Sequence, residues 1–371
     1  MSVRVALAAA FVAIASVASP VMAATAFRQP ELVSLGMTES SLVIAGGRPH
    51  IAARGEHGIW YFTRENGAWT GQRLTYFPGD SNSPTHGEPA IAMDPVDGSL
   101  TIVFERRVPE DLVGGCENLG LRSITNRSGD WSEFSERVGD DEADSHCMMD
   151  PSLVVRDGSM YVAGGVGTVP VPGAPQRVRY LTNVTGDWTS EDVRGSRWAS
   201  LALDSSGNPH IAYQRRFVSD EDEVTWNIVR ARGTSPTGGF VKDKIADGVD
   251  LVSPASLALS SADKPRVTWS EPDGIHYAVR TSSGWSDETI APNLSVTDLV
   301  IDPFGIAHMT ASGAGRLWYL TGPQDGGAGD FDIVDVTAGE PPRGGLDVGP
   351  NGIVQTSFQR GDDLWWVRSK P

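Results

Sequence analysis

Three of the seven histidines could carry proton-transfer chemistry, because the repeated pattern of the sequence does not account for them. They are His57, His86 and His146, and an imidazole changes its charge close to neutral pH. Glu88 follows His86 by two residues, and Glu105 ends the next apolar segment. A histidine and a carboxylate that share a site can act as general acid and general base. The predicted catalytic candidates are His86, His146, Glu88 and Glu105.

Arginine and tryptophan side chains near the same parts of the chain could bind a ligand. Two arginine pairs each follow an apolar segment, and a single tryptophan stands before another such segment. A guanidinium can hold a carboxylate or sulfate through two hydrogen bonds, and an indole offers a flat face to a sugar ring. The predicted ligand-binding residues are Arg106, Arg107, Trp198, Arg215, Arg216 and His57. The alternative is that these arginines pair with surface carboxylates and that the histidines only pack.

The elements that must position these residues belong to an internal repeat. Ser41–Ala52, Ser200–Tyr213 and Ser256–Trp269 each read as a short apolar strand, a turn and a second apolar strand. Weaker copies begin at Pro89, Pro151, Asp298 and Leu346. A third strand with an aromatic residue follows each hairpin, and a turn and a fourth strand come next. A repeat of this length is typical of a β-propeller.

The fourth strand sets the number of repeats. In most copies it opens with an aromatic residue and has an aliphatic residue five positions later, as in Trp69 with Leu74. Phe27 and Leu32 show the same offset with no first three strands before them, while Leu346–Val367 supplies three strands without a fourth. The two ends of the chain therefore complete one blade, which removes the exposed sheet edge of an open array.

This pattern predicts an all-β fold, a seven-bladed β-propeller of four-stranded blades whose ring is closed by the N-terminal strand. We expect residues 24–371 to form this single domain, with residues 24–36 as the fourth strand of the closing blade. The loops between second and third strands are long at 108–118, 164–176 and 217–224. They emerge on the face where first strands begin, which we call the top face. Insertions on one face of a repeat protein usually mark its binding face.

Position within the repeat also separates structural histidines from the candidates. His50, His210 and His308 each stand three residues after a turn glycine, at the start of a second strand. Gln355 takes the matching position in the last repeat, so we interpret these three histidines as structural. His86 and His146 instead precede the first strands of the second and third blades, and both are expected at the top face.

The turn before the fourth strand resembles the Asp box of sialidase-like (BNR) propellers. It is present as Thr63–Thr70, Thr125–Ser132 and Thr182–Thr189, each with a tryptophan, but without the aspartate of the box. The resemblance implies a propeller architecture over nearly the whole mature chain. The Arg-Ile-Pro element of sialidases is absent, so the resemblance does not imply sialidase activity. Seven-bladed polysaccharide lyases and lectins are similar in architecture only.

The N-terminus reads as a secretory signal peptide over residues 1–23, with a charged start, a short apolar core and a small-residue cleavage site. The apolar core is shorter than the ~20 residues needed to span a bilayer, so no membrane span is expected. We therefore expect a secreted protein, either extracellular or periplasmic. An oxidising compartment would allow a disulfide between Cys116 and Cys147; the alternative is two separate thiols.

Composition excludes several partners and cofactors. The chain has 371 residues and a formal net charge of −17, which argues against nucleic-acid binding. No histidine pair has the close spacing of a metal site, so no metal is expected. The acidic run 219–223 suggests calcium, but its spacing matches no known calcium loop, and no cofactor is predicted.

These observations predict a secreted ligand-binding propeller that takes a glycan or polysaccharide on its top face. One alternative is an enzyme that cleaves a polysaccharide, a lyase or a glycoside hydrolase, with His86 or His146 acting beside Arg106 or Arg215. The second alternative is a scaffold for a protein partner. Whether the protein is an enzyme stays open at this point.

Overall fold

The structure is a computed structural model. It describes residues 26–76, 85–107, 118–132, 134–140, 148–167, 177–193, 195, 198–218, 224–250, 253–322, 331–338 and 345–371. For His86, Arg107 and a few other residues at strand ends, only the backbone is described. Cys116, Cys147 and His146 lie outside the described residues, so the predicted disulfide and one catalytic candidate stay predictions. Among the described residues, no helix is long and apolar enough to cross a membrane.

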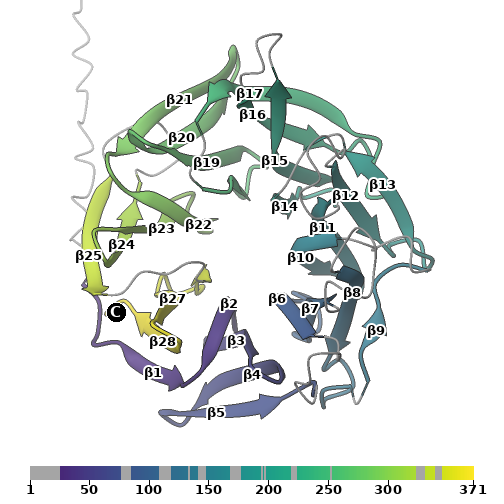
Figure 1. Cartoon of the computed structure of the whole chain (residues 1–371), viewed down its shortest axis with the longest axis vertical. Helices are drawn as coiled ribbons and strands as arrows, with labels where there is room; N and C mark the ends of the chain where they lie inside the picture. The colour runs from purple at the N-terminus through teal and green to yellow at the C-terminus, as the bar shows by residue number, and fades with distance from the viewer. Residues whose placement is uncertain are drawn as a thin grey trace, which may run out of the picture.

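Seven four-stranded antiparallel sheets surround a central channel, as predicted (Figure 1). Blade 1 contains β2 (Met37–Ala45), β3 (Arg48–Gly55), β4 (Gly58–Glu65) and β5 (Ala68–Arg73). Blade 2 contains β6 (Thr85–Met93), β7 (Leu100–Arg107), β8 (Asn118–Thr125) and β9 (Glu136–Arg137). Blade 3 contains β10 (Met148–Arg156), β11 (Ser159–Val166), β12 (Arg177–Thr182) and β13 (Thr189–Val193).

The remaining blades follow the same order from the channel outward. Blade 4 contains β14 (Ala199–Leu203), β15 (Pro209–Val218), β16 (Val224–Arg232) and β17 (Val241–Val249). Blade 5 contains β18 (Ser256–Leu259), β19 (Pro265–Glu271), β20 (Gly274–Thr281) and β21 (Gly284–Ala291). Blade 6 contains β22 (Ser295–Ile301), β23 (Ala307–Gly313), β24 (Arg316–Thr321) and β25 (Asp332–Ala338). Blade 7 contains β26 (Leu346–Val348), β27 (Val354–Arg360), β28 (Asp363–Arg368) and β1 (Glu31–Ser34).

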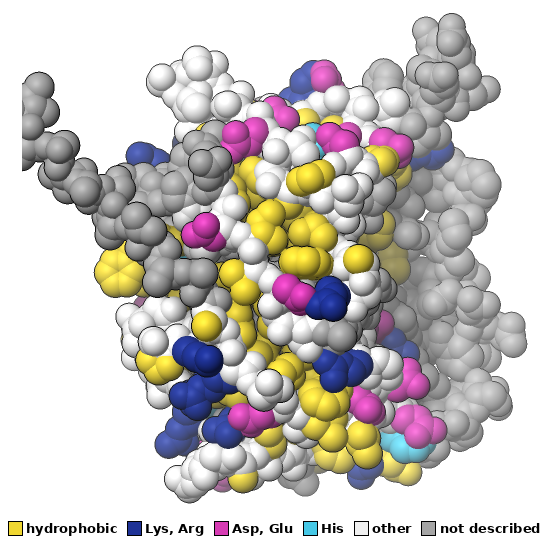
Figure 2. Space-filling view, turned by 90° about the vertical axis from the view of Figure 1, so that its left-hand side faces the viewer, with side chains coloured by type: hydrophobic (Ala, Val, Ile, Leu, Met, Phe, Trp, Pro, Cys, Tyr) yellow, Lys and Arg dark blue, Asp and Glu magenta, His cyan; other side chains and the backbone are white. Residues whose placement is uncertain are grey.

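The two ends of the chain close the ring, which confirms the predicted topology. Strand β1 pairs antiparallel with β28, with Glu31 opposite Trp366. Arg64 in blade 1 holds both carboxylate oxygens of Glu31, at 2.8 and 3.1 Å, and so ties the closing blade to its neighbour. Seen from the side of β25 and β1, the outer wall mixes hydrophobic side chains with charges of both signs (Figure 2). Leu32 and Ile333 are exposed there on β1 and β25.

The repeated aromatic residues form the contacts between blades. Tyr61 in the third strand of blade 1 meets Trp131 of blade 2, with ring centroids 4.9 Å apart. Tyr180 of blade 3 meets Phe240 of blade 4 in the same way, edge to face at 5.5 Å. Similar pairs join the later blades: Tyr277 with Phe331, Tyr319 with Phe27 and Trp366 with Trp69. Since a single twisted sheet cannot bury both faces, each blade depends on its neighbours for stability, and these pairs are part of that packing.

The histidines that begin second strands are structural, as interpreted from the repeat. His50 and His308 each place Nδ1 against a tyrosine hydroxyl of the adjacent strand. His210 is 3% exposed and lies 3.7 Å from Asp204, the carboxylate that shapes the turn before it. All three lie on the bottom face, at the opposite end of the channel from the starts of the first strands.

Candidate functional site

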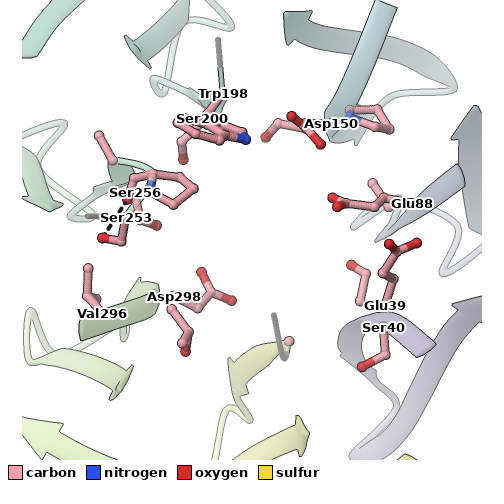
Figure 3. Close-up of a pocket in the computed structure, with 18 of the residues that line it drawn as sticks. Glu39, Ser40, Glu88, Asp150, Trp198, Ser200, Ser253, Ser256, Val296 and Asp298 are labelled. Atoms are coloured by element: carbon pink, nitrogen blue, oxygen red, sulfur yellow. Dashed lines mark hydrogen bonds between the residues drawn. The ribbon is translucent and has the colours of Figure 1, made fainter. Parts of the chain in front are cut away.

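A cavity of about 730 Å³ occupies the mouth of the channel on the top face (Figure 3). The first strands of the blades line it, because these strands surround the channel and begin at this face. Gly361, in the turn between β27 and β28, also contributes to the rim. The cavity therefore lies on the face where the long loops were predicted to emerge.

Three carboxylates enter the cavity from equivalent positions of blades 1, 2 and 3. Glu39, Glu88 and Asp150 all lie at a break in the register between the first and second strands. Such a β-bulge turns a side chain away from the regular alternation of the strand. Glu39 and Asp150 also have left-handed backbone angles, with φ of 47° and 51°. The bulges thus direct a row of neighbouring carboxylates toward the channel, on one side of the cavity in Figure 3.

Trp198 takes the corresponding position in blade 4, directly before β14. Its φ is 49°, in the left-handed region that a bulky residue rarely adopts. Such a conformation costs about 1–3 kcal/mol and persists only where the surrounding structure imposes it. Trp198 is half-buried and lines the cavity beside Asp150 (Figure 3).

Deeper in the channel, hydroxyl and carboxyl groups join several first strands to the next blade. The Oγ atoms of Ser152 and Ser200 accept hydrogen bonds from the backbone N–H groups of Leu201 and Leu257, at 3.0 and 2.9 Å. Ser41 makes the same bond to blade 2 at 3.3 Å. These serines also line the cavity, so the groups that hold the ring together form much of its polar wall.

An aspartate replaces the serine in blade 6. Asp298 Oδ2 accepts a hydrogen bond from Leu346 N of blade 7 at 3.0 Å, and Oδ1 accepts one from Leu299 N. Burial raises the pKa of Asp298 to about 7, although these backbone donors oppose the shift. Burial likewise raises the pKa of Asp347 in blade 7 to about 6. The cavity wall thus contains a carboxyl group that exchanges its proton near neutral pH.

The described lining of the cavity includes one indole, several hydroxyls and four carboxyl groups among small apolar residues, and it includes no lysine or arginine. Carboxylates accept hydrogen bonds from sugar hydroxyls, and serine and threonine hydroxyls both accept and donate them. A flat indole face beside them suits a sugar ring. Within the described residues, no three histidine, cysteine, aspartate or glutamate side chains are placed to hold a metal ion.

The structure brings two of the predicted site residues into this cavity, Trp198 and Glu88. Glu105 lies behind it, because its side chain is fully buried and its Oε1 accepts a hydrogen bond from Asp150 N at 2.7 Å. That bond supports the bulge at Asp150, so the catalytic role predicted for Glu105 does not follow from its position.

The other predicted site residues are not among the described residues that line the cavity. Arg215 and Arg216 are exposed on the part of β15 that extends beyond β14. Arg106 lies opposite His86 in the ladder between β6 and β7. His57 is in the turn between β3 and β4, 3.7 Å from Glu56, and packs edge-on against Tyr76. The predicted cluster of arginines around the mouth is therefore absent from the described lining.

Sequence reasoning missed Glu39, Asp150 and Asp298. A signal for two of them was present, because Glu39 and Asp150 each stand two residues before the small residue that opens the repeated hairpin. Glu88 and Trp198 hold the same position in their blades. Comparing this one position across the repeats would have grouped all four residues.

Comparisons with known proteins agree with the fold. No family model and no curated protein matches the chain. Among solved structures, an ulvan lyase from a new family of polysaccharide lyases matches with a TM-score of 0.58 and 10% identity, over 90% of this chain and 95% of that one. An α-L-arabinanase from Penicillium chrysogenum matches with a TM-score of 0.53 and 10% identity, over 93% and 98%. A Hadza microbial sialidase matches with a TM-score of 0.51 and 10% identity, over 92% and 68%.

The fold and the cavity together define the class: a seven-bladed β-propeller with an acidic, serine-lined cavity at the top of its channel. The architectural resemblance to sialidase-like propellers is confirmed, since a sialidase is among the similar structures. At these identities the similarity shows the fold alone.

Proposed function

We propose that the protein binds a glycan in the cavity at the mouth of its channel, with Trp198 as the stacking platform. The observation that carries this proposal is the left-handed backbone of Trp198, with φ of 49°, at the rim of a 730 Å³ cavity. A conformation that costs free energy persists where the fold imposes it, and here its effect is to present an indole to an open, polar space. We also propose that residues 1–23 direct export, so that the ligand is met outside the cytoplasm.

The polar wall supports the same function. Ser41, Ser152 and Ser200 are held by bonds to the next blade, so their oxygen atoms keep fixed positions. Preorganised polar groups favour binding because little conformational entropy is lost when the ligand arrives. Several of the similar structures are enzymes that act on polysaccharides or glycosides, by their names, which agrees with a sugar ligand.

The test is to measure binding of a panel of oligosaccharides to the wild type and to the variant Trp198→Ala. We expect the variant to lose about tenfold or more in affinity, because stacking of a nucleobase on an aromatic side chain contributes on the order of 1–3 kcal/mol and a sugar ring is expected to gain a comparable amount. Phe304→Ala is the matched control, because Phe304 is an aromatic residue exposed at 61% on the bottom face. Equal affinities for wild type and Trp198→Ala across the panel would remove the proposal.

A second candidate is hydrolysis of a glycosidic bond, favoured by the three carboxylates at equivalent bulges. Glycoside hydrolases generally use two carboxyl groups that face the scissile bond from the same cavity. Glu88 lies between Glu39 and Asp150 along the ring, so it is the residue to change first. If the protein is a hydrolase, Glu88→Gln abolishes the release of new reducing ends while the oligosaccharide still binds. Absence of reducing ends with the wild type over the whole panel would leave a binding protein.

The remaining alternatives receive less support. A lyase that acts on a uronate would need a cation for the substrate carboxylate, and the described lining includes none. The scaffold alternative predicts that a protein partner is captured by the wild type and by Trp198→Ala equally. Capture that depends on Trp198 would instead point back to the cavity.

A further inference from the structure

One seam between neighbouring blades departs from the repeated aromatic contact. At equivalent register, the third strand has an aromatic residue in five blades and Arg230 in blade 4. Each of these side chains packs on an aromatic residue of the next blade. Blade 2 has Ser123 at this position, opposite Val103, just as Tyr61 stands opposite Ala52 in blade 1. The seam between blades 2 and 3 therefore lacks a ring-sized side chain.

A pocket of about 190 Å³ occupies this seam, and we call it the seam pocket. It lies toward the bottom face, because its lining includes Ser99 and Gly158 from the turns between first and second strands. Ser123 also lines it and is 4% exposed, and the Ser123 hydroxyl has no hydrogen-bond partner among the described residues. Trp188, which opens the fourth strand of blade 3, is not in the described lining and packs instead in the apolar cluster that includes Met160. The space that a large side chain fills in other seams is thus open in this one.

The position that meets the ring hydroxyl in other blades is polar in blade 2 as well. In blades 1 and 6, His50 and His308 begin the second strand and hydrogen-bond to the hydroxyl of a tyrosine. Thr101 takes this position in blade 2 and lines the seam pocket, and its Oγ1 donates to Thr125 Oγ1 at 3.3 Å. Because the proton of Thr101 Oγ1 is used in that bond, its lone pairs can accept a hydrogen bond from a ligand.

The rest of the described lining suits a neutral ring. Val155 and Met160 supply apolar contacts, and a methionine sulfur packs favourably against an aromatic ring. Arg127 is half exposed and pairs with Asp97 at 3.0 Å, and Glu136 is exposed, so the charged groups lie at the solvent edge. The interior therefore combines hydroxyl groups with an apolar wall.

We propose that the seam pocket binds a small phenol, in the place that a tyrosine side chain takes in other seams. The ring would pack against the apolar wall, and its hydroxyl would donate to Thr101 Oγ1. The size agrees, since an engineered protein cavity of about 150 Å³ takes up benzene. This site goes beyond the proposed function and does not depend on it, because the seam pocket and the cavity at the mouth of the channel lie toward opposite faces.

The test compares p-cresol with toluene in calorimetric binding experiments. Both ligands have the ring of a tyrosine side chain, and only p-cresol has the hydroxyl. We expect p-cresol to bind about threefold to tenfold more tightly, which is the net effect of one hydrogen bond. Thr101→Val removes the acceptor and keeps the shape, so it should bring the two affinities within about twofold of each other. Failure of the wild type to bind p-cresol, or an undiminished preference for it in Thr101→Val, would overturn the proposal.

A second variant fills the seam pocket. Ser123→Tyr gives blade 2 the residue that blades 1, 3, 5 and 6 have at this position, and it should abolish binding of p-cresol. Ser283→Tyr is the matched control, because it makes the same change in an exposed turn of blade 5 and should leave the affinity unchanged. Circular dichroism checks that each variant is folded, and Thr101→Val carries the test if Ser123→Tyr is not. Binding of p-cresol that persists in folded Ser123→Tyr would place the ligand elsewhere and refute the assignment.

Two further ligands distinguish a free phenol from other occupants. N-acetyltyrosine amide has the same ring as part of a protein chain, and methyl glucoside has several hydroxyl groups without an aromatic face. We expect p-cresol to bind most tightly of the three. If N-acetyltyrosine amide binds more tightly, the ring comes from a partner protein; if methyl glucoside binds as tightly as p-cresol, hydroxyl groups alone select the ligand. Either result would rule out a small phenol as the occupant.

Discussion

Asp298 Oδ2 lies 3.0 Å from the backbone nitrogen of Leu346, the residue that begins the first strand of the next blade. The same relationship joins Ser200 to Leu257 and Ser152 to Leu201, with a hydroxyl in place of the carboxyl. Each bond satisfies a backbone N–H that faces the neighbouring blade near the channel. The groups that line the cavity are therefore also part of what holds the ring together.

Replacement of one of these serines should destabilise the ring. Ser200→Ala leaves the N–H of Leu257 without its acceptor, and a buried donor without a partner costs about 1–3 kcal/mol. We expect a lower midpoint in thermal and urea unfolding. Ser283→Ala, in an exposed turn of blade 5, is the control and should change the midpoint little. Equal midpoints for Ser200→Ala and wild type would show that water or another group replaces the hydroxyl.

Asp298 should make the stability of the protein fall as pH rises. Burial raises its pKa from 3.8 to about 7 in the folded state, so its contribution is complete below pH 3.8 and is lost as pH rises toward 7. Asp298→Asn removes this titration, although it also weakens the bond to Leu346 at every pH. The difference in unfolding free energy between wild type and variant should therefore shrink from pH 4 to pH 7. A difference that stays constant over this range would contradict the raised pKa.

The contribution of His210 to stability should depend on pH in the opposite direction to that of Asp298. Burial, followed by the charge of Arg230, lowers its pKa from 6.5 to about 4. Its contribution to stability is therefore complete above pH 6.5 and is lost as pH falls toward 4, because the unfolded chain takes up the proton first. His210→Gln uses the residue that blade 7 has at this position, Gln355. The free energy of unfolding in urea should fall less for the variant than for the wild type between pH 6.5 and 4. Equal falls for the two proteins would refute the lowered pKa of His210.

The closing strand should be required for a stable ring. A chain that begins at Gly36 lacks β1 and exposes the edge of β28, together with one side of Trp366. It also loses the ion pair between Glu31 and Arg64. We expect a lower melting temperature and association of the exposed edges, visible in thermal unfolding and size-exclusion chromatography. A chain that begins at Ala26 retains β1 and should behave as the intact ring; identical melting of both chains would show that closure adds nothing.

Much of the architecture was predictable from short-range patterns. The aromatic residues of third and fourth strands recur at nearly constant offsets, and the structure shows why: Tyr61 and Trp131, or Tyr180 and Phe240, are the two halves of one contact between blades. Phe27 repeats this role from the other end of the chain, so its offset from Leu32 was enough to predict the closure. A contact that recurs between five pairs of neighbouring blades leaves a periodic trace in the sequence.

The site was predictable only in part. Trp198 and Glu88 were recognised as exceptions to the repeat, and both line the cavity. Arg215 and Glu105 were also predicted as site residues. Arg215 is exposed to solvent on the extension of β15, whereas the alternation of side chains along β7 turns Glu105 into the core.

By itself, then, the sequence determined the fold class, the number of blades and the way the ring closes, because each depends on local strand patterns and on contacts that repeat. The shared cavity of Glu39, Glu88, Asp150 and Trp198 depends instead on the folded arrangement of the blades. Bulges redirect these side chains, and the packing of successive blades brings residues separated by about fifty positions along the chain to neighbouring points on the rim of the channel. The repeat marks the shared position of these residues, but the direction of each side chain depends on where the backbone departs from regular geometry.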